Sequence, residues 1–335
     1  SEETFRDFII ISAAWRDLIR ARYNGRVNIT EADIDRALGA SRGETGIRVL
    51  LSEIIIPAPP QNADRVNALA EQIAESESEA QFCDRMVADL EALIDREGPD
   101  TIGAFIAEPV MGAGGVVVPP ATYWEKIQAV LAKYDILLIA DEVICGFGRT
   151  GNMFGSTTFD IKPDILTMSK QITSSYFPFS AFMINDRVYQ PIADESGRIG
   201  VLGHGYTGGG HPVGAAVALE NIKIIEERDL VANAAERGAE LQAGLTDLTS
   251  HPLVGEARGI GLIGALELIA PEGKSGDFAP GKLGAQMNAI MLRNGLISRN
   301  MTDAMAFCPP LIVGANDVRE IIQITKKSLE ELAAD

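Results

Sequence analysis

Three short apolar segments in the middle of the chain each end abruptly at an ionisable residue, and this pattern constrains the fold most. The pairs are residues 102–107 with Glu108, 136–140 with Asp141, and 165–169 with Lys170. Helical patterns separate the segments, which is typical of buried parallel strands in an α/β sheet. One such charged residue usually marks only where a strand leaves the core, but open α/β sheets bind ligands at the carboxyl ends of their strands. Three together predict a site with two carboxylates and a lysine.

The spacing of apolar residues predicts the other elements. A helix that includes Phe82 should stop at Gly98, and Thr122 with Glu125 forms a capping-box signature for a helix that ends near Tyr134. Further along we expect a helix over 212–228, a strand over 261–268, a helix over 283–293 and a terminal helix from about Asp317. The fold class is thus α/β, a central mostly parallel sheet flanked by helices, followed by a smaller C-terminal α+β domain.

The charge balance argues against several kinds of partner. The chain has 29 Lys and Arg residues against 47 Asp and Glu residues, a net charge of −18, so it should repel nucleic acids and anionic membrane surfaces. No apolar run approaches the roughly 20 residues that span a bilayer, and the first residues do not read as a secretory signal. Three cysteines without a CxxC pair and three scattered histidines predict neither disulfides nor a metal site. We expect a cytoplasmic protein.

A lysine at a strand end suggests covalent carbonyl chemistry, because a desolvated amine loses its proton readily and can form a Schiff base. Pyridoxal phosphate needs such a lysine, an acid against its pyridinium nitrogen, and donors for its phosphate. The glycine-rich segment 203–212 opens onto a helix and offers backbone amides and a helix N-terminus to an anion. A glycine-rich turn before a helix serves packing about as often, so this segment alone decides nothing.

Five motifs resemble those of the class III, pyridoxal-phosphate-dependent aminotransferases. They are Phe-Ile-Ala-Glu-Pro-Val at 105–110, Leu-Ile-Ala-Asp-Glu-Val through Gly-Arg-Thr-Gly at 138–151, Lys-Pro-Asp-Ile-Leu-Thr-Met-Ser-Lys at 162–170, Thr-Gly-Gly-Gly-His-Pro-Val at 207–213, and Gly-Leu-Ile-Ser-Arg at 295–299 with Phe-Cys-Pro-Pro-Leu at 307–311. Their order and spacing fit the family over about residues 51–335. The resemblance implies the fold-type-I architecture, with a large domain for pyridoxal 5'-phosphate (51–235), a small C-terminal domain (236–335), and a homodimer with shared active sites.

The resemblance also implies a role for each candidate site residue. Lys170 resembles the lysine that forms the Schiff base with the cofactor and then moves a proton, and Asp141 matches the acid paired with the pyridine nitrogen. Val143 matches the aliphatic residue that packs on the cofactor ring, although an ordinary core valine has similar weight. Thr207 resembles the threonine that binds the phosphate across the dimer interface, and Glu108 an active-site glutamate near the cofactor.

Two positions bear on the substrate. Ornithine- and GABA-type members carry a glutamate shortly after the Glu-Pro motif, where this chain has Ala113, so the pattern resembles the amine:pyruvate, or omega-, aminotransferases instead. In those enzymes an arginine near the Cys-Pro-Pro segment binds the carboxylate of pyruvate or alanine, and Arg299 has that place; the alternative is a surface arginine near a strand end. The resemblance implies ping-pong transfer of an amino group from an amine or omega-amino acid donor to pyruvate or a similar keto acid, through a Schiff base on Lys170.

The first fifty residues do not follow the family pattern. Family members carry a Gly-Ser-x-x-Asn loop for the phosphate and an aromatic-His-Gly segment that stacks on the cofactor; the nearest segment here, 41–46, has no aromatic residue. Either the sequence joins segments that are not adjacent in the complete protein, which we favour, or the protein lacks these parts. Other functions stay open: a Schiff-base aldolase or dehydratase, a decarboxylase or aminomutase that uses pyridoxal phosphate, and a cofactor-poor, non-catalytic homologue.

Overall fold

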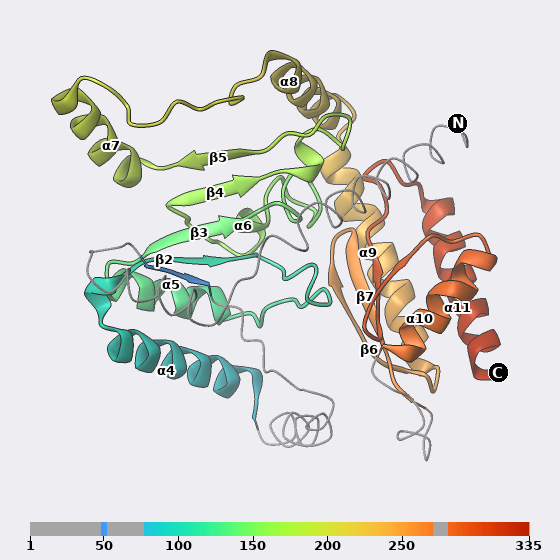
Figure 1. Ribbon diagram of the computed structural model, residues 1–335. Helices are drawn as coiled ribbons and strands as arrows, with labels where there is room; N and C mark the ends of the chain where they lie inside the picture. Colours follow the sequence, from blue (N-terminus) through green and yellow to red (C-terminus); the bar gives the residue numbers. More distant parts are fainter. Residues whose placement is uncertain (1–47, 52–76, 271–280, 335) are drawn as a thin grey trace, which may run out of the picture. The chain divides into compact units, whose positions relative to one another are not determined.

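The computed structural model describes residues 48–51, 77–270 and 281–334 (Figure 1). These residues belong to one compact unit, 48–335. Of the predicted N-terminal segment 1–50, all but residues 48–50 lies outside the described residues, as does the segment 41–46. None of the described helices is both long and apolar enough to cross a membrane.

A five-stranded sheet carries the first half of the described chain, in the spatial order β1-β2-β3-β4-β5. The strands are β1 (Arg48–Leu51), β2 (Ile102–Ala107), β3 (Leu137–Asp141), β4 (Ile165–Met168) and β5 (Ala181–Ile184). Strands β1 to β4 pair in parallel and β5 runs antiparallel to β4, so the prediction of a mostly parallel sheet is confirmed. Strand β1 crosses the predicted domain boundary at residue 50, which places residues 48–50 in this sheet.

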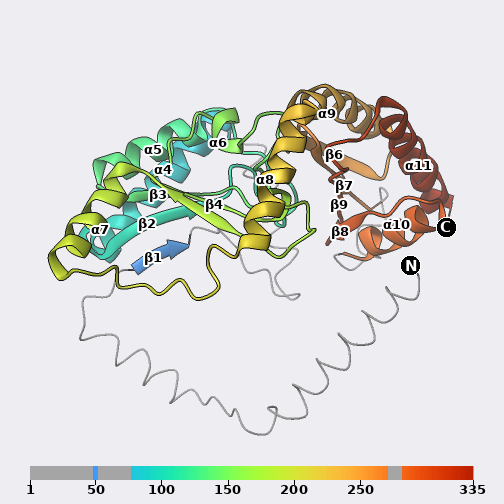
Figure 2. The same ribbon diagram turned by 90° about the horizontal axis from the view of Figure 1, so that it is seen from above.

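Helices cover the sheet and fix its core. They are α4 (Glu79–Glu97), α5 (Tyr123–Lys133), α6 (Gly155–Thr158), α7 (Asp186–Ile199) and α8 (Pro212–Glu227). Helices α4 and α5 lie on the same side of the sheet (Figure 2). Their apolar faces bury Ile94, Trp124 and Leu131 against Phe105 and Leu138 of β2 and β3, in a cluster of large side chains that are each less than a tenth exposed. Burying such side chains stabilises the fold by roughly 1.5–3 kcal/mol each.

The second half of the described chain forms a smaller antiparallel sheet, in the order β6-β7-β9-β8. Its strands are β6 (Val254–Ile260), β7 (Ile263–Leu268), β8 (Arg299–Met301) and β9 (Ala304–Phe307), and its helices are α9 (Leu230–Asp247), α10 (Lys282–Arg293) and α11 (Ala315–Ala334). Fully buried Leu241, Met287, Met305 and Leu329 join these helices to the sheet. The prediction of a smaller α+β part at the C-terminal end is confirmed, while the boundary at residue 235 stays a prediction.

The helix ends show where local sequence reasoning succeeded and where it failed. Helix α4 stops at Gly98, as predicted, because this residue has a φ of +86°, a conformation that glycine adopts without strain. Helix α5 begins where predicted, but the capping box at Thr122 is wrong. Thr122 has a helical backbone (φ −97°, ψ 0°) and its side chain makes no capping hydrogen bond, because an N-cap side chain can reach back only from an extended backbone. The capping box lies at Ser78 and Gln81 instead.

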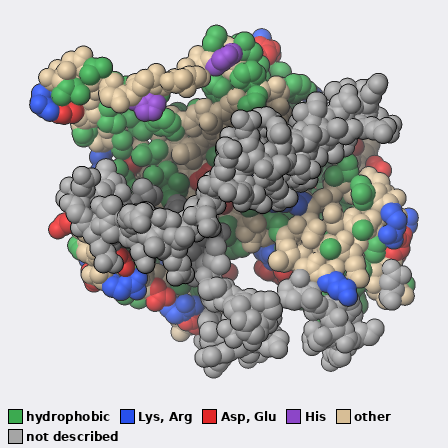
Figure 3. All heavy atoms as spheres, viewed as in Figure 1, with side chains coloured by type: hydrophobic (Ala, Val, Ile, Leu, Met, Phe, Trp, Pro, Cys, Tyr) green, Lys and Arg blue, Asp and Glu red, His purple; other side chains and the backbone are tan. Residues whose placement is uncertain are grey.

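One face of this molecule exposes large apolar side chains. Figure 3 shows them around β5 and the start of α8. On β5, Phe182 is 56% exposed, and on α8, Leu219 is 69% exposed. Exposed apolar patches of this kind mark surfaces that bind another molecule.

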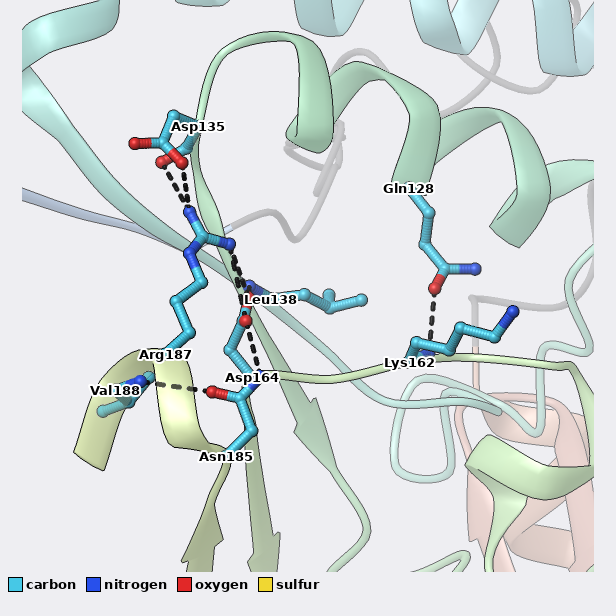
Figure 4. A network of polar contacts seen from close by, with 8 residues as sticks. All are labelled: Gln128, Asp135, Leu138, Lys162, Asp164, Asn185, Arg187 and Val188. Carbon is cyan, nitrogen blue, oxygen red and sulfur yellow. Dashed lines mark hydrogen bonds and ion pairs between the residues drawn. The ribbon is translucent and has the colours of Figure 1, made fainter. Parts of the chain in front are cut away.

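A buried carboxylate joins strands β3, β4 and β5 at the ends that lie away from the predicted site. Asp164, which is only 8% exposed, accepts hydrogen bonds from the amide of Leu138 (2.9 Å) and from Nδ2 of Asn185 (2.8 Å), and it pairs with Arg187 at 3.3 Å (Figure 4). Asn185 in turn caps α7, since its Oδ1 accepts from the amide of Val188. The start of β3, the start of β4 and the end of β5 are therefore held by one side chain.

We expect Asp164→Ala to lower the free energy of unfolding by about 2 kcal/mol, because it leaves the buried amide of Leu138 without its acceptor. Arg187 also loses Asp164 but keeps its bonds to Asp135. Urea unfolding followed by circular dichroism measures the change. The matched control is Lys162→Ala, since the ion pair of Lys162 with Asp160 is more than four-fifths exposed and should contribute less than about 1 kcal/mol. Equal unfolding midpoints for the two variants would contradict this prediction.

Candidate active site

The register of the parallel strands brings three predicted site residues to one edge of the sheet. Ala107 pairs with Ala140, so the residue after each of them, Glu108 and Asp141, leaves its strand at the same level. Asp141 pairs with Thr167 of β4, and Lys170 follows two residues after that strand ends. All three residues therefore lie at the carboxyl ends of adjacent strands, where open α/β sheets bind their ligands.

The carboxylate of Asp141 is held by its own chain. Its Oδ1 accepts a hydrogen bond from the amide of Val143, two residues on, at 3.0 Å. This local bond fixes the side chain as the chain turns out of β3. Both residues are half-buried, and Oδ2 has no hydrogen-bond donor among the described residues. The carboxylate is therefore oriented but keeps one oxygen for another group.

Glu108 is half-buried and lies under the loop that follows β2. Its Oε2 accepts from the amide of Gly112 at 3.0 Å. A Cβ on Gly112 would lie 2.4 Å from Cδ1 of Ile144, so a larger residue here would have to displace the Ile144 side chain. The predicted comparison position, Ala113, is exposed on the same loop.

A buried thiol lies among the acids at this edge. The Sγ of Cys145 donates to the carbonyl of Val110, 3.6 Å away. Burial is the largest cause that raises the pKa of Cys145 to about 12. The charges of Glu142, Glu108 and Asp141 contribute to the same rise, and the hydrogen bond to Val110 opposes it. The carboxylates of Glu108, Asp141 and Glu142 therefore lie close enough to Cys145 to act on its thiol.

Lys170 stands on a strained backbone. Its φ is +45°, in the left-handed region that side chains other than glycine, asparagine and aspartate rarely adopt. It opens a short 3-10 turn, Lys170–Ile172, which α8 holds in place, since Nδ2 of Asn221 donates to the carbonyls of Gln171 (2.6 Å) and Ile172 (3.3 Å). The lysine is exposed, and its amine has no hydrogen bond or ion pair with the described residues.

The predicted substrate residue Arg299 begins β8 of the smaller sheet and is exposed. It pairs with Ala306 of β9, which leads to the exposed Cys308. Although part of Cys308 faces solvent, the protein atoms packed around it raise its pKa, and the charges of Arg149, Lys170 and Arg299 oppose that rise. Lys170 and Arg299 therefore act on the same sulfur, which links the smaller sheet to the strand-end site.

The structure does not bring Thr207 to the other candidates. Residues 201–210 are all exposed, and no hydrogen bond of Thr207 is found in the described part of the chain. The glycine-rich segment does lead into α8 at Pro212, but the hydrogen bonds within it are local: the amide of Tyr206 donates to Nδ1 of His204, and the amide of Gly209 to the carbonyl of Tyr206. Within the described ranges, no group of three or more His, Cys, Asp or Glu side chains is arranged to hold a metal ion.

Sequence reasoning missed Glu142, the residue after Asp141. This carboxylate is fully buried and accepts from the amide of Gly155 (2.9 Å), the amide of Ser156 (2.5 Å) and the hydroxyl of Ser156 (2.6 Å). It anchors the start of α6 directly behind the strand that carries Asp141. An acidic pair after an apolar strand was visible in the sequence, but only the folded chain shows which acid turns inward.

Comparisons with known proteins identify relatives of this chain. The family model for class-III aminotransferases matches residues 33–329. A solved transaminase with L-ala is 62% identical, with a TM-score of 0.75 over 77% of this chain and 61% of that one. The omega transaminase from Pseudomonas jessenii in complex with PMP is 55% identical, with a TM-score of 0.74 over 77% of this chain and 57% of that one.

A curated relative, the mitochondrial gamma aminobutyrate transaminase 1 of Solanum lycopersicum, is 46% identical over 76% of this chain and 50% of its own length. The chain thus spans between 50% and 61% of the length of these three proteins. The fold-type-I architecture and the family predicted from the motifs are confirmed.

The two thiols of the site should react differently. At pH 8 we expect an aromatic disulfide reagent to modify Cys308 first, and Cys145 and the buried Cys83 only after unfolding, because a thiol with a pKa near 12 holds almost no thiolate at that pH. Absorbance of the released thiolate counts the sulfurs that react. Cys308→Ser should remove the fast reaction. Two or more fast sulfurs in the folded protein would contradict the buried position of Cys145.

Proposed function

Because the chain belongs to the class-III aminotransferases, we propose that it transfers an amino group from an amine or omega-amino acid donor to a keto acid. The observation that carries this proposal is the convergence of Glu108, Asp141 and Lys170 at the ends of three adjacent strands. An amine without a protein partner beside an oriented carboxylate is the arrangement that carbonyl chemistry on a pyridine cofactor requires.

The donor set fits pyridoxal phosphate, which when bound supplies an electron sink for the bond broken at the substrate carbon. Asp141 offers a carboxylate oxygen that no described residue occupies, suited to a protonated pyridine nitrogen. Val143 follows at the same turn and offers an apolar side chain to a ring face. Support for this cofactor also comes from the Pseudomonas jessenii relative, whose structure contains PMP.

We assign the covalent and proton-transfer roles to Lys170. With pyridoxal phosphate bound, its amine would hold the cofactor as the nucleophile. After release it would take a proton from the substrate carbon and deliver it to the cofactor. The strained turn, held by Asn221, fixes the direction of the lysine stem, so the amine returns to one place after each exchange. Glu108 shapes the floor of the site through Gly112.

We assign Arg299 to the carboxylate of the acceptor, with pyruvate as the keto acid. A guanidinium binds a carboxylate through two parallel hydrogen bonds, and Arg299 is exposed with no ion pair among the described residues. A 62% identical relative was solved with L-ala, the amino acid that pyruvate becomes. Ala113 favours an amine:pyruvate specificity over a GABA specificity, because the loop beside Glu108 carries no acid at that position.

We further propose that a second copy of the chain covers the exposed apolar surface. Eleven apolar side chains between residues 176 and 219 are exposed: Tyr176, Phe182, Met183, Tyr189, Ile192, Ile199, Val201, Leu202, Tyr206, Val213 and Leu219. Thr207 is exposed and directly follows Tyr206 in the same stretch of chain. A homodimer would therefore bury these side chains and carry each Thr207 to the partner's cofactor phosphate, a site that one chain alone does not complete.

The proposal is tested first by adding pyridoxal phosphate, desalting the protein, and recording its visible spectrum before and after an amine donor is added. We expect a band that the amine bleaches and pyruvate restores. Lys170→Ala should lower the transamination rate by about 10²–10⁴-fold, the usual contribution of a positioned proton-transfer group. Lys162→Ala, which changes an exposed lysine outside the site, is the control. A colourless parent protein would refute the proposal.

The dimer is tested by sedimentation velocity. We expect the unmodified chain to sediment as a dimer, and Leu219→Asp to shift it towards the monomer, because the new carboxylate would be desolvated at the interface. Leu292 on α10 is also exposed, at 60%, and lies outside the apolar surface. Leu292→Asp should leave the dimer intact. A monomeric unmodified chain, or equal dimerisation of both variants, would argue against this surface.

A further inference from the structure

Arg149 is half-buried and makes no ion pair within the described ranges. It follows Asp141 by eight residues, on the segment that leaves β3. Burial lowers the pKa of its guanidinium, and it takes part in no ion pair with the described residues. Its Nη1 instead donates to two backbone carbonyls, those of Leu262 (2.9 Å) and Pro309 (2.6 Å). These two bonds fix the guanidinium to the backbone of the smaller sheet, and partial burial makes them costly to break.

The two carbonyls lie just outside the ends of two neighbouring strands of the smaller sheet. Leu262 immediately precedes β7, and Pro309 lies two residues beyond the end of β9. These strands are paired, with Gly264 opposite Phe307. The backbone of Arg149 also accepts a bond from the amide of Leu262, at 2.9 Å. One residue thus holds the ends of both strands against the segment that follows Asp141.

Close packing around this contact prevents the segment at Arg149 from moving along the smaller sheet. A Cβ on Gly261, in the turn before Leu262, would lie 2.6 Å from the carbonyl oxygen of Arg149. Gly261 also has a φ of +56°, so the turn depends on glycine. On the other side, a Cβ on Gly151 would lie 3.2 Å from Cα of Ala235 in α9.

Arg149 binds the chain just after β9, and β9 pairs with β8, the strand that begins with Arg299. Arg299 pairs with Ala306, three residues before Pro309, so a shift of the 306–309 backbone moves Arg299 with it. Cys308 lies between Ala306 and Pro309 in the sequence. The charges of Arg149, Lys170 and Arg299 oppose the rise that burial causes in the pKa of its thiol. Arg149 therefore connects the segment that carries Asp141 to the strand pair that carries Arg299.

We propose that Arg149 is a positioning residue for the substrate carboxylate. It holds Arg299 at a fixed distance from Lys170 and Asp141, so that a carboxylate bound by Arg299 presents its neighbouring carbon to the amine of Lys170. Loss of this contact weakens the recognition of ligands that carry a carboxylate and leaves ligands without one unaffected. This inference rests on the proposed transaminase function.

The test compares two reagents on the chain loaded with pyridoxal phosphate. Aminooxyacetate and O-methylhydroxylamine both bleach the bound cofactor through the same aminooxy group, but only aminooxyacetate carries a carboxylate. The ratio of their trapping rates, read by stopped-flow absorbance, measures recognition of the carboxylate. We expect Arg149→Met to lower this ratio by roughly tenfold, as loss of an aligned ionic contact does. We expect Arg149→Lys to stay within about threefold of the parent ratio, since an ammonium can still donate to both carbonyls.

Two further variants separate the possible failures. Arg299→Met should lower the ratio as well, and Arg187→Met, which loses an arginine at the opposite edge of the sheet, should not change it. If Arg299→Met lowers the ratio and Arg149→Met does not, the role of Arg149 is refuted. If neither lowers it, the assignment of Arg299 itself fails.

A second measurement needs no cofactor. Amide hydrogen exchange of residues 304–311 should be faster in Arg149→Met than in the parent chain, while exchange in β2 and β3 stays the same. Unchanged exchange at 304–311 would refute the tether even if the chain binds no pyridoxal phosphate. Absence of a cofactor band with faster exchange would instead support the tether and refute the proposed function of the chain.

Discussion

The hydrogen-bonded register of β2, β3 and β4 is the constraint on which the site depends. Because Ala107 is paired with Ala140, and Asp141 with Thr167, the residues that follow these strands emerge side by side. A one-residue shift would turn each side chain to the other face of the sheet. Asp164 protects this register from the opposite edge, where it binds the starts of β3 and β4 and the end of β5. The same strand pairing therefore determines both the contacts of Asp164 at one end of the strands and the positions of the site residues at the other end.

Cys145 and Cys308 lie in different electrostatic surroundings: acidic residues are near Cys145, and basic residues are near Cys308. Burial raises the pKa of both thiols. Glu142, Glu108 and Asp141 add to the rise at Cys145, whereas Arg149, Lys170 and Arg299 oppose it at Cys308. The acidic side suits a protonated ring nitrogen, and the basic side suits the carboxylate of a keto acid. A transaminase needs both, since its substrate carries a carboxylate and its cofactor a ring that must stay protonated. The separation of charge across the site is thus consistent with the proposed reaction, although neither thiol has a part in it.

Local patterns gave much of the fold. Strand β2 and helix α8 lie where the apolar spacing predicted them, because a buried strand or an amphipathic helix needs its apolar residues at fixed intervals. The prediction of a capping box at Thr122 was wrong although the residue types fit the motif, because the backbone of Thr122 is helical rather than extended. Glu142 and Arg149 were missed for a different reason: whether a charged side chain turns inward depends on partners such as Ser156 and Pro309, which lie 14 and 160 residues away.

The sequence by itself determined that this chain forms a mostly parallel sheet, which residues end its strands, and which family the motifs resemble. These properties depend on short-range order, since apolar periodicity and motif spacing are written along the chain. Only the tertiary structure decided that Lys170 stands on a left-handed turn held by Asn221, that Thr207 remains apart from the other candidates, and that Arg149 joins the two sheets. Such facts arise from contacts between distant segments, whose geometry is set by packing and hydrogen bonding that no local pattern specifies.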